Sequence, residues 1–158
     1  LPKGYGWSFS NGGPYHDLTV TKGGMLQSHI VAMDAVDYRY TCSDEQYTEP
    51  HMLRDLNKCY SGFCTPRTPS VIATGNWGCG VFGGNAELKS LLQWISASMA
   101  EKSISYFPFD HEVIAERYGK DTQKAIQNGV RVCDMIQFVL SIDPKSSVAD
   151  QFSDWLER

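Results

Sequence analysis

The sequence has 158 residues, which corresponds to one domain, or part of a larger one, at roughly 150 residues per domain. With 42% hydrophobic and 20% charged residues, its composition is globular and excludes a disordered or collagen-like chain. The net charge of −4 excludes a generally basic nucleic-acid-binding face, and no apolar run approaches the roughly 20 residues that span a bilayer.

The first 28 residues are rich in glycine, serine, threonine and asparagine and show little periodicity. Structureless leaders of this kind are uncommon in compact domains, and the numbering begins at Leu1 instead of a methionine. We therefore expect the chain to begin partway through a domain, in a surface loop.

Two elements are expected before the middle of the chain. The short apolar run 29–33, closed by Asp34, predicts a buried strand that ends at a carboxylate. Apolar residues then recur at helical spacing over 52–60, which predicts a helix that Thr48 can cap and Gly62 ends.

A strand–loop–helix–strand series follows. The segment 65–69 contains two prolines and is expected to be an exposed loop. The β-branched run 70–74 predicts a buried strand, and 103–107 predicts a second one. Between them lie the glycine-rich run 75–84 and a helix that Asn85 can cap. Because this order makes a βαβ unit, the two strands should be parallel.

The helix of this unit shows an apolar stripe opposite a polar side, which is typical of a surface helix. The stripe consists of Leu88, Leu91, Leu92, Ile95 and Met99, and the polar side consists of Glu87, Lys89, Gln93 and Glu101.

The rest of the chain is expected to be helical, so the class is α/β. Asp110 can cap a short helix that runs through Tyr118, and Phe152, Trp155 and Leu156 form an apolar group at the end of the chain. A further apolar stripe consists of Ile126, Val130, Cys133, Ile136 and Leu140.

Five glycines in the run 75–84 leave backbone N–H groups unshielded, ahead of the positive end of a helix dipole. Such a group of amides suits a phosphate or diphosphate, so an acidic protein can bind a polyanion without a basic surface. The plain alternative is a tight turn without a ligand. The string Gly78-x-Gly80-x-x-Gly83 also matches the dinucleotide fingerprint, with Asp110 after the next strand. A P-loop is excluded, because no Lys-Ser/Thr pair follows the glycines.

The run ATGNWGCGVFGGNAELKSLLQ, followed by a YFPF strand, resembles the diphosphate-binding loop and following helix of poly(ADP-ribose) glycohydrolase. The upstream segments IVAMDAVDYR and LRDLNKCYSGF resemble the same family in order and spacing. The resemblance covers roughly residues 1 to 110 and leaves out the tail. It implies a macrodomain-like α/β fold, a mixed sheet flanked by helices, with 1–158 supplying the C-terminal portion of a single catalytic domain.

The resemblance also implies roles for individual residues. The loop would hold the diphosphate of ADP-ribose through main-chain amides. Phe82 would position the distal ribose, Phe109 would pack against adenine, and Tyr5 would cover the ligand. The candidate ligand-binding residues are therefore Tyr5, Gly75, Asn76, Trp77, Gly78, Cys79, Gly80, Val81, Phe82 and Phe109.

Several of these residues have an alternative role. Phe109 is equally a core aromatic at the end of an apolar strand, and Tyr5 is equally an ordinary exposed loop residue. Trp77 is better explained as a wedge that fixes the loop to the domain. Cys79 lies near a helix N-terminus, where a nucleophile has a lowered pKa. No histidine is near it in sequence, so a small buried thiol is the preferred interpretation.

Cleavage of a ribose–ribose bond needs an acid for the leaving oxygen and a base for water. The resembling family supplies both from a glycine triplet followed closely by Gln-Glu-Glu, which this sequence lacks. We therefore expect no catalytic residue in this chain, and an enzyme whose catalytic loop lies on a preceding segment or companion chain. A non-catalytic ADP-ribose-binding module and a dinucleotide-dependent oxidoreductase fragment are the alternatives.

The remaining expectations concern partners and surroundings. The four histidines are scattered without metal-ligand spacing, so neither a metal nor a cofactor is expected. Five cysteines without a CxxC pair indicate free thiols in a reducing compartment, the nucleus or the cytoplasm. The expected partners are poly(ADP-ribose) or ADP-ribose and the companion segment, with no membrane and no DNA.

Overall fold

The computed structural model describes residues 2–3, 10–11, 13, 21–26, 29–65 and 69–158. The chain divides into two compact units, 1–30 and 31–158, and each is described by itself. Among the described residues, no helix combines the length and the apolar character needed to cross a membrane.

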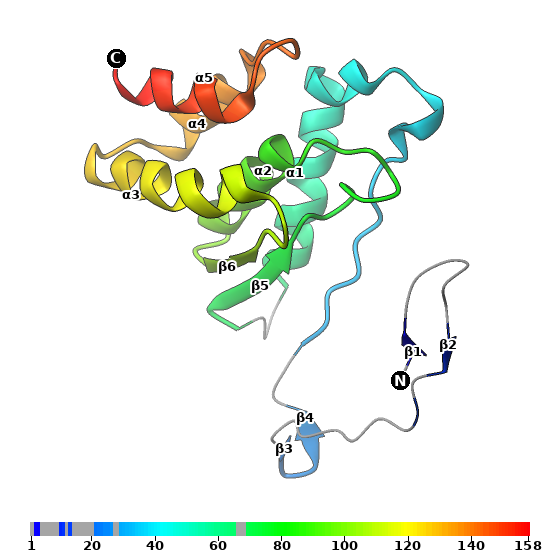
Figure 1. Cartoon of the computed structure of the whole chain (residues 1–158). Helices are drawn as coiled ribbons and strands as arrows, with labels where there is room; N and C mark the ends of the chain where they lie inside the picture. The colour runs from blue at the N-terminus through cyan, green and yellow to red at the C-terminus, as the bar shows by residue number, and fades with distance from the viewer. Residues whose placement is uncertain (1, 4–9, 12, 14–20, 27–28, 66–68) are drawn as a thin grey trace. The chain divides into compact units, whose positions relative to one another are not determined.

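The first unit contains two short antiparallel strand pairs (Figure 1). β1 (Pro2–Lys3) pairs with β2 (Ser10–Asn11). β3 (Thr21–Lys22) pairs with β4 (Met25–Leu26) across a turn of two glycines in left-handed conformation.

The strand expected at 29–33 does not form. The backbone there is irregular, and Ile30 is 94% exposed. In the second unit, the side chains of Val31 and Met33 lie against Gly62, where a Cβ atom would come within 2.8 Å of each of them. The prediction of a buried strand is therefore wrong, because no described strand pairs with this run, and Val31 and Met33 pack on a helix instead.

That helix is α1 (Glu49–Phe63), which follows two 3₁₀ turns, η2 (Tyr38–Tyr40) and η3 (Ser43–Tyr47). Thr48 occupies its N-cap position as predicted, but its hydroxyl donates to the carbonyl oxygen of Glu45 and makes no capping hydrogen bond to the helix. Gly62 lies inside the last turn and does not end the helix, since its missing side chain makes room for the segment described above. The face turned inward carries Met52, Asp55, Leu56, Cys59 and Phe63.

The βαβ unit forms as predicted (Figure 1). β5 (Val71–Gly75) and β6 (Ser103–Phe107) are parallel, with Val71 opposite Ser103 and Gly75 opposite Phe107. One face of this pair packs on α2 (Ala86–Met99), and Ile72 is the buried residue of β5. The other face is uncovered by the described residues, since Val71 is 52% and Phe107 is 56% exposed. The strands are therefore buried on one side instead of both.

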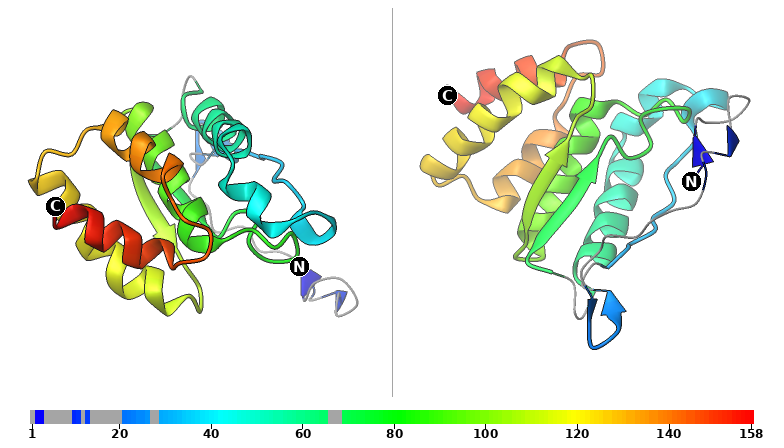
Figure 2. Two further views of the ribbon diagram at one scale, coloured as in Figure 1. Left: turned by 90° about the horizontal axis from the view of Figure 1, so that it is seen from above. Right: turned by 60° about the horizontal axis from the view of Figure 1, so that its bottom comes forward.

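Helix α2 lies between α1 and the C-terminal helices (Figure 2). Its leucine stripe is buried as predicted, but Lys89 and Gln93 are fully buried too. The predicted polar side is therefore wrong at these two positions, because Lys89 pairs with Asp55 of α1 and Gln93 bonds to Thr74 and Gly75 of β5. Met99, at the helix end, is 44% exposed instead of buried.

The tail is helical, with boundaries that differ from the predicted ones. The helix expected to stop at Tyr118 passes through a π-helical turn, η4 (Ile114–Tyr118), and continues as α3 (Gly119–Gln127). Gly129, with a φ of 67°, then interrupts the helical conformation. It is followed by α4 (Val132–Leu140) and α5 (Val148–Leu156).

This break makes the predicted stripe over 126–140 wrong. Cys133 is exposed and Ile126 is 67% exposed, while α4 buries Met135, Phe138 and Val139. The predicted terminal aromatic group is present. The centre of the Phe152 ring lies 5.4 Å from that of Phe138, 6.0 Å from that of Tyr118 and 6.4 Å from that of Trp94. Because Trp94 belongs to α2, these contacts anchor the tail on that helix.

Candidate functional site

The glycine-rich loop connects the carboxyl end of β5 to the N-terminus of α2. Part of its backbone is bonded internally: Trp77 N–H donates to Gly75 O, Cys79 to Asn76, Gly83 to Gly80 and Gly84 to Gly78. In contrast, no described residue accepts a hydrogen bond from the amides of Gly78, Gly80, Val81 and Phe82. The loop thus combines a closed internal frame with four amides that are available to a ligand.

Both ends of the loop are held by buried amide side chains. At the start, Gln93 Nε2 donates to Gly75 O at 3.1 Å, and Gln93 Oε1 accepts from the Thr74 hydroxyl at 2.6 Å. At the end, Gln46 Oε1 accepts from Asn85 N–H at 2.6 Å. The Asn85 side chain accepts from Leu88 N–H at 2.8 Å and caps α2, as predicted. These contacts fix the positions at which the loop leaves β5 and enters the helix.

Asn76 ties the loop to the neighbouring strand. Its Nδ2 donates to Pro108 O at 2.8 Å, and its Oδ1 accepts from the Tyr106 hydroxyl at 2.9 Å. Since this side chain already has partners on both of its polar ends, it acts as a brace between the loop and the end of β6.

Trp77 acts as a wedge, which was the interpretation preferred from the sequence. Its Nε1 donates to the carbonyl oxygen of Met33 at 3.0 Å, and its ring packs on a small cluster with Cys59, Phe63 and Ile72. The indole therefore fastens the loop to the segment that precedes η2.

The far side of the loop is held by the same segment. Tyr38 N–H donates to the carbonyl oxygen of Phe82 at 2.8 Å. The guanidinium of Arg39 lies 5.6 Å from the centre of the Phe82 ring. Phe82 and Val81 are both exposed, so the tip of the loop presents two apolar side chains to solvent.

A cavity of about 600 Å³ opens beside the loop. Phe109, at the end of β6, is 83% exposed with a φ of 53°, so the core alternative for this residue does not hold. A Cβ atom on Gly75 would lie 3.5 Å from the Phe109 ring, so the ring lies close to the start of the loop. The lining residues are Asn76, Cys79, Gly80, Gly84, Asn85, Ala86, Phe109 and His111.

The cavity thus brings together some of the predicted residues and not others. Asn76, Cys79, Gly80 and Phe109 line it. The remaining predicted loop residues (Gly75, Trp77, Gly78, Val81 and Phe82) belong to the same loop without lining it. Tyr5 lies outside the described residues.

His111 lines the cavity and was missed by sequence reasoning. Its Nδ1 atom is buried without a hydrogen-bond partner among the described residues. A histidine in a loop after a strand carries no sequence signal of its own, and its place two residues after Phe109 was the one available hint.

Cys79 is a half-buried thiol and not a nucleophile. Burial raises its pKa to about 11, and this effect outweighs the opposite influence of nearby Lys89. Its Sγ lies 3.4 Å from the Trp77 carbonyl oxygen, which accepts the thiol proton. A thiol that stays protonated at neutral pH is a poor nucleophile, so the small-thiol interpretation is the better one.

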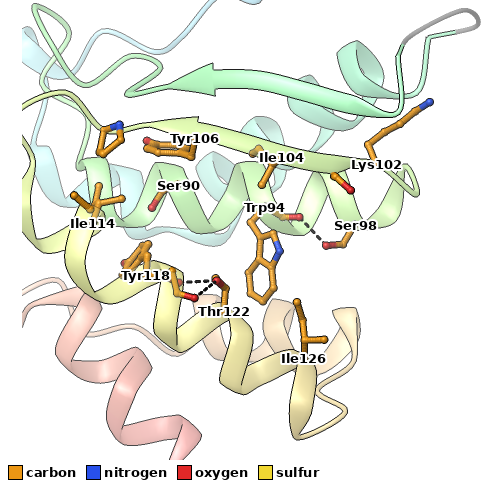
Figure 3. Close-up of a pocket in the computed structure, with 14 residues that line it drawn as sticks. Ser90, Trp94, Ser98, Lys102, Ile104, Tyr106, Ile114, Tyr118, Thr122 and Ile126 are labelled. Carbon is orange, nitrogen blue, oxygen red and sulfur yellow. Dashed lines mark hydrogen bonds between the residues drawn. The ribbon is translucent and has the colours of Figure 1, made fainter.

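Two other kinds of site are not supported. Among the described residues, no group of three histidine, cysteine or acidic side chains is placed to hold a metal ion. A second cavity, of about 650 Å³, lies between β6 and α2 on one side and η4 and α3 on the other (Figure 3). Its hydroxyl groups on Ser98, Tyr118 and Thr122 already donate to backbone carbonyl oxygens. Its lining is mostly apolar, and these three hydroxyls are engaged.

A family model described as "Poly (ADP-ribose) glycohydrolase (PARG), Macro domain fold" matches residues 2–116. The chain is 29% identical over 113 residues to Poly(ADP-ribose) glycohydrolase 1 of Caenorhabditis elegans, which covers 68% of this chain and 14% of that protein. It is 28% identical over 135 residues to Poly(ADP-ribose) glycohydrolase 2 of the same organism. This match covers 82% of the present chain and 28% of that protein.

A shorter segment is more similar to a plant protein. Over 44 residues the chain is 54% identical to Poly(ADP-ribose) glycohydrolase 1 of Arabidopsis thaliana, which covers 27% of this chain and 8% of that protein. The chain thus spans less than a third of the length of each of these curated relatives.

Proposed function

The chain belongs to the poly(ADP-ribose) glycohydrolase family, and from this premise we propose that it forms the ADP-ribose-binding half of a poly(ADP-ribose) glycohydrolase active site. The reaction is hydrolysis of the ribose–ribose O-glycosidic bonds of poly(ADP-ribose), which releases ADP-ribose. Its α/β fold is of the macrodomain type. Residues 1–158 are the C-terminal portion of a single catalytic domain in this proposal.

One observation supports this function above the others: four unpaired amides lie in a glycine loop whose neighbouring cavity is also lined by an exposed aromatic ring. Amides at a helix N-terminus bind phosphate oxygens, and an exposed ring provides a stacking surface for a base. A ligand in which an adenosine is attached to a diphosphate matches this pairing.

The proposed roles follow from that match. The loop residues 75–82 hold the diphosphate through their main chain, since their polar side chains are used internally. Phe82 positions the distal ribose and Phe109 stacks on adenine. Tyr5 covers the ligand.

The proton-transfer groups lie outside this chain in this proposal. Glycosidic cleavage passes through an oxocarbenium-like state and needs a carboxylic acid beside the leaving oxygen. Among the residues that the structure describes, no carboxylate lines the cavity next to the loop. A glutamate pair on a preceding segment or companion chain supplies the acid and the base.

The test is calorimetric titration of the whole protein with ADP-ribose and with NADH, combined with an assay for ADP-ribose release from the polymer. Tight ADP-ribose binding with release supports the proposal. Binding without release in the presence of the preceding segment leaves a non-catalytic binding module. Binding of NADH but not of ADP-ribose overturns the proposal in favour of a dinucleotide enzyme.

We also propose that the protein acts in the nucleus or the cytoplasm. Its five cysteines are all free thiols, which is typical of a reducing compartment. No membrane or DNA contact is part of the proposal.

A further inference from the structure

Lys89 is a charged residue in the interior of the second unit. Its side chain is 0% exposed, and it forms an ion pair with Asp55 of α1, which is 2% exposed. Charges are rarely buried this completely unless they are paired, and this pair joins the helix after the glycine loop to the helix before it.

The Lys89 ammonium also lies beside two aromatic rings that hold the loop. Its Nζ is 4.9 Å from the centre of the Trp77 ring and 5.5 Å from the centre of the Tyr38 ring. Both distances are within the range of a cation–π interaction. Trp77 belongs to the loop, and Tyr38 N–H donates to the carbonyl of Phe82 at the other side of the loop.

The aliphatic part of Lys89 contacts the loop directly. A Cβ atom placed on Gly84 would lie 3.2 Å from Lys89 Cε and 2.8 Å from the carbonyl oxygen of Gly78. Gly84 N–H donates to that same carbonyl, so the turn that closes the loop rests on the lysine stem. One side chain therefore touches the closing turn and the two rings that hold the loop.

Asp55 extends the arrangement to the surface. Arg54 Nη1 lies 3.1 Å from Asp55, and Arg54 Nη2 lies 2.8 Å from Asp34. Asp34 follows Met33, whose carbonyl oxygen accepts the Trp77 hydrogen bond. These ion pairs thus connect the segment at Asp34 to α1 and, through Asp55, to Lys89 of α2.

Burial of an ion pair is a poor way to gain stability, because desolvation offsets the attraction and an apolar pair of similar volume is often as stable. We propose that Lys89, held by Asp55, is a positioning residue that fixes the loop in the shape that leaves four of its amides without a hydrogen-bond partner among the described residues. This proposal rests on the proposed function, because the amides matter for ADP-ribose. Ligand sites require their contacting groups to be held within a fraction of an ångström.

The experiment compares the whole protein with three variants: Lys89→Met, Asp55→Leu and the double variant. Lys89→Met leaves the buried Asp55 with Arg54 alone, Asp55→Leu leaves the buried Lys89 without a carboxylate, and each change lowers the midpoint of thermal unfolding. The double variant is expected to regain that midpoint while its dissociation constant for ADP-ribose rises at least about tenfold. A double variant that is stable and binds within about twofold of the parent overturns the positioning role.

The matched control is the exposed pair Lys124 and Glu157, which joins α3 to the end of α5. The double change Lys124→Met with Glu157→Leu should leave both stability and affinity unchanged, since exposed ion pairs contribute little. If the double core variant does not fold, Asp55→Asn keeps the side-chain volume and is measured in its place. Unchanged affinity in that variant also overturns the proposal.

A ligand-free measurement separates this proposal from the proposed function. The amide NMR signals of Gly78, Gly80 and Phe82 should move in the double variant and stay in place in the surface control. If the parent protein does not bind ADP-ribose but these signals move, the function fails and the positioning role stands. If the parent protein binds ADP-ribose and the signals do not move in the double variant, the proposed function stands and the positioning role of Lys89 fails.

Discussion

The indole Nε1 of Trp77 donates a hydrogen bond to the main-chain carbonyl of Met33, at 3.0 Å. This bond joins the glycine loop to a stretch without regular secondary structure, which itself lies against Gly62 of α1. The position of the loop therefore depends on a segment that contributes nothing to the lining of the cavity.

Trp77→Phe should lower the free energy of unfolding by about 1 kcal/mol, the typical contribution of one hydrogen bond, and should weaken ADP-ribose binding because the loop loses its anchor. Denaturant unfolding and calorimetry measure the two effects. Trp155→Phe, which alters a half-buried indole in α5, is the control. Equal affinity in both variants would contradict the wedge role.

Phe109→Ala should weaken ADP-ribose binding by about tenfold or more, since stacking on a base contributes roughly 1–3 kcal/mol. The ring is 83% exposed, so the thermal unfolding midpoint should hardly change. Phe107→Ala is a close control, because that ring is also exposed, on the uncovered face of the sheet and away from the cavity. An equal loss of affinity in both variants would argue against adenine stacking.

Replacement by alanine should have different effects on protein stability at Gly80 and at Gly78. A Cβ atom on Gly80 meets open space, so Gly80→Ala should change stability by less than about 0.5 kcal/mol while it crowds the cavity and lowers affinity. Gly78 has a φ of 74°, and its Cβ atom would lie 2.6 Å from Ala35. Gly78→Ala should therefore cost about 2 kcal/mol in stability. Full affinity in a well-folded Gly80→Ala protein would place the ligand elsewhere.

Stability should fall in alkaline solution because of Cys59. Burial raises the pKa of this thiol from 9.0 to about 12, so the unfolded chain ionises first. The contribution of Cys59 to the free energy of unfolding is complete below about pH 9. It is lost as the pH rises towards 12, at up to about 1.4 kcal/mol per pH unit. Denaturant unfolding between pH 7.5 and about 10.5 gives the slope.

The variant Cys59→Ala separates this effect from packing. It should be less stable at neutral pH, because a buried sulfur is removed, but its stability should decline less steeply with pH. Cys42→Ala, at an exposed position, should keep the parent slope. If the free energy of unfolding of Cys59→Ala falls with pH as steeply as that of the parent protein, other groups cause the loss of stability.

The sequence was sufficient for the βαβ unit, because its signals are local: β-branched runs, an asparagine cap and a dense glycine run. It was not sufficient for Lys89 and Gln93. Helical periodicity identifies the polar side of α2, but whether water or a neighbouring helix covers that side is a tertiary property.

The tail shows a second limit. Two sets of apolar residues at helical spacing overlap there, and the positive φ of Gly129 decides between them by breaking the helix. His111 could not be predicted, because its role depends on a cavity that forms between separate elements. The run 29–33 looks like a strand by composition, yet a strand also needs a partner.

The anchoring of Phe152 against Trp94 and Tyr118 has a practical consequence. The family model matches as far as residue 116, while the rings that seal the leucines of α2 come from beyond it. The end of the matched family model and the end of the packed core therefore do not coincide. A truncation after residue 116 would cut through this core, and we expect it to destabilise α2 and the glycine loop before it.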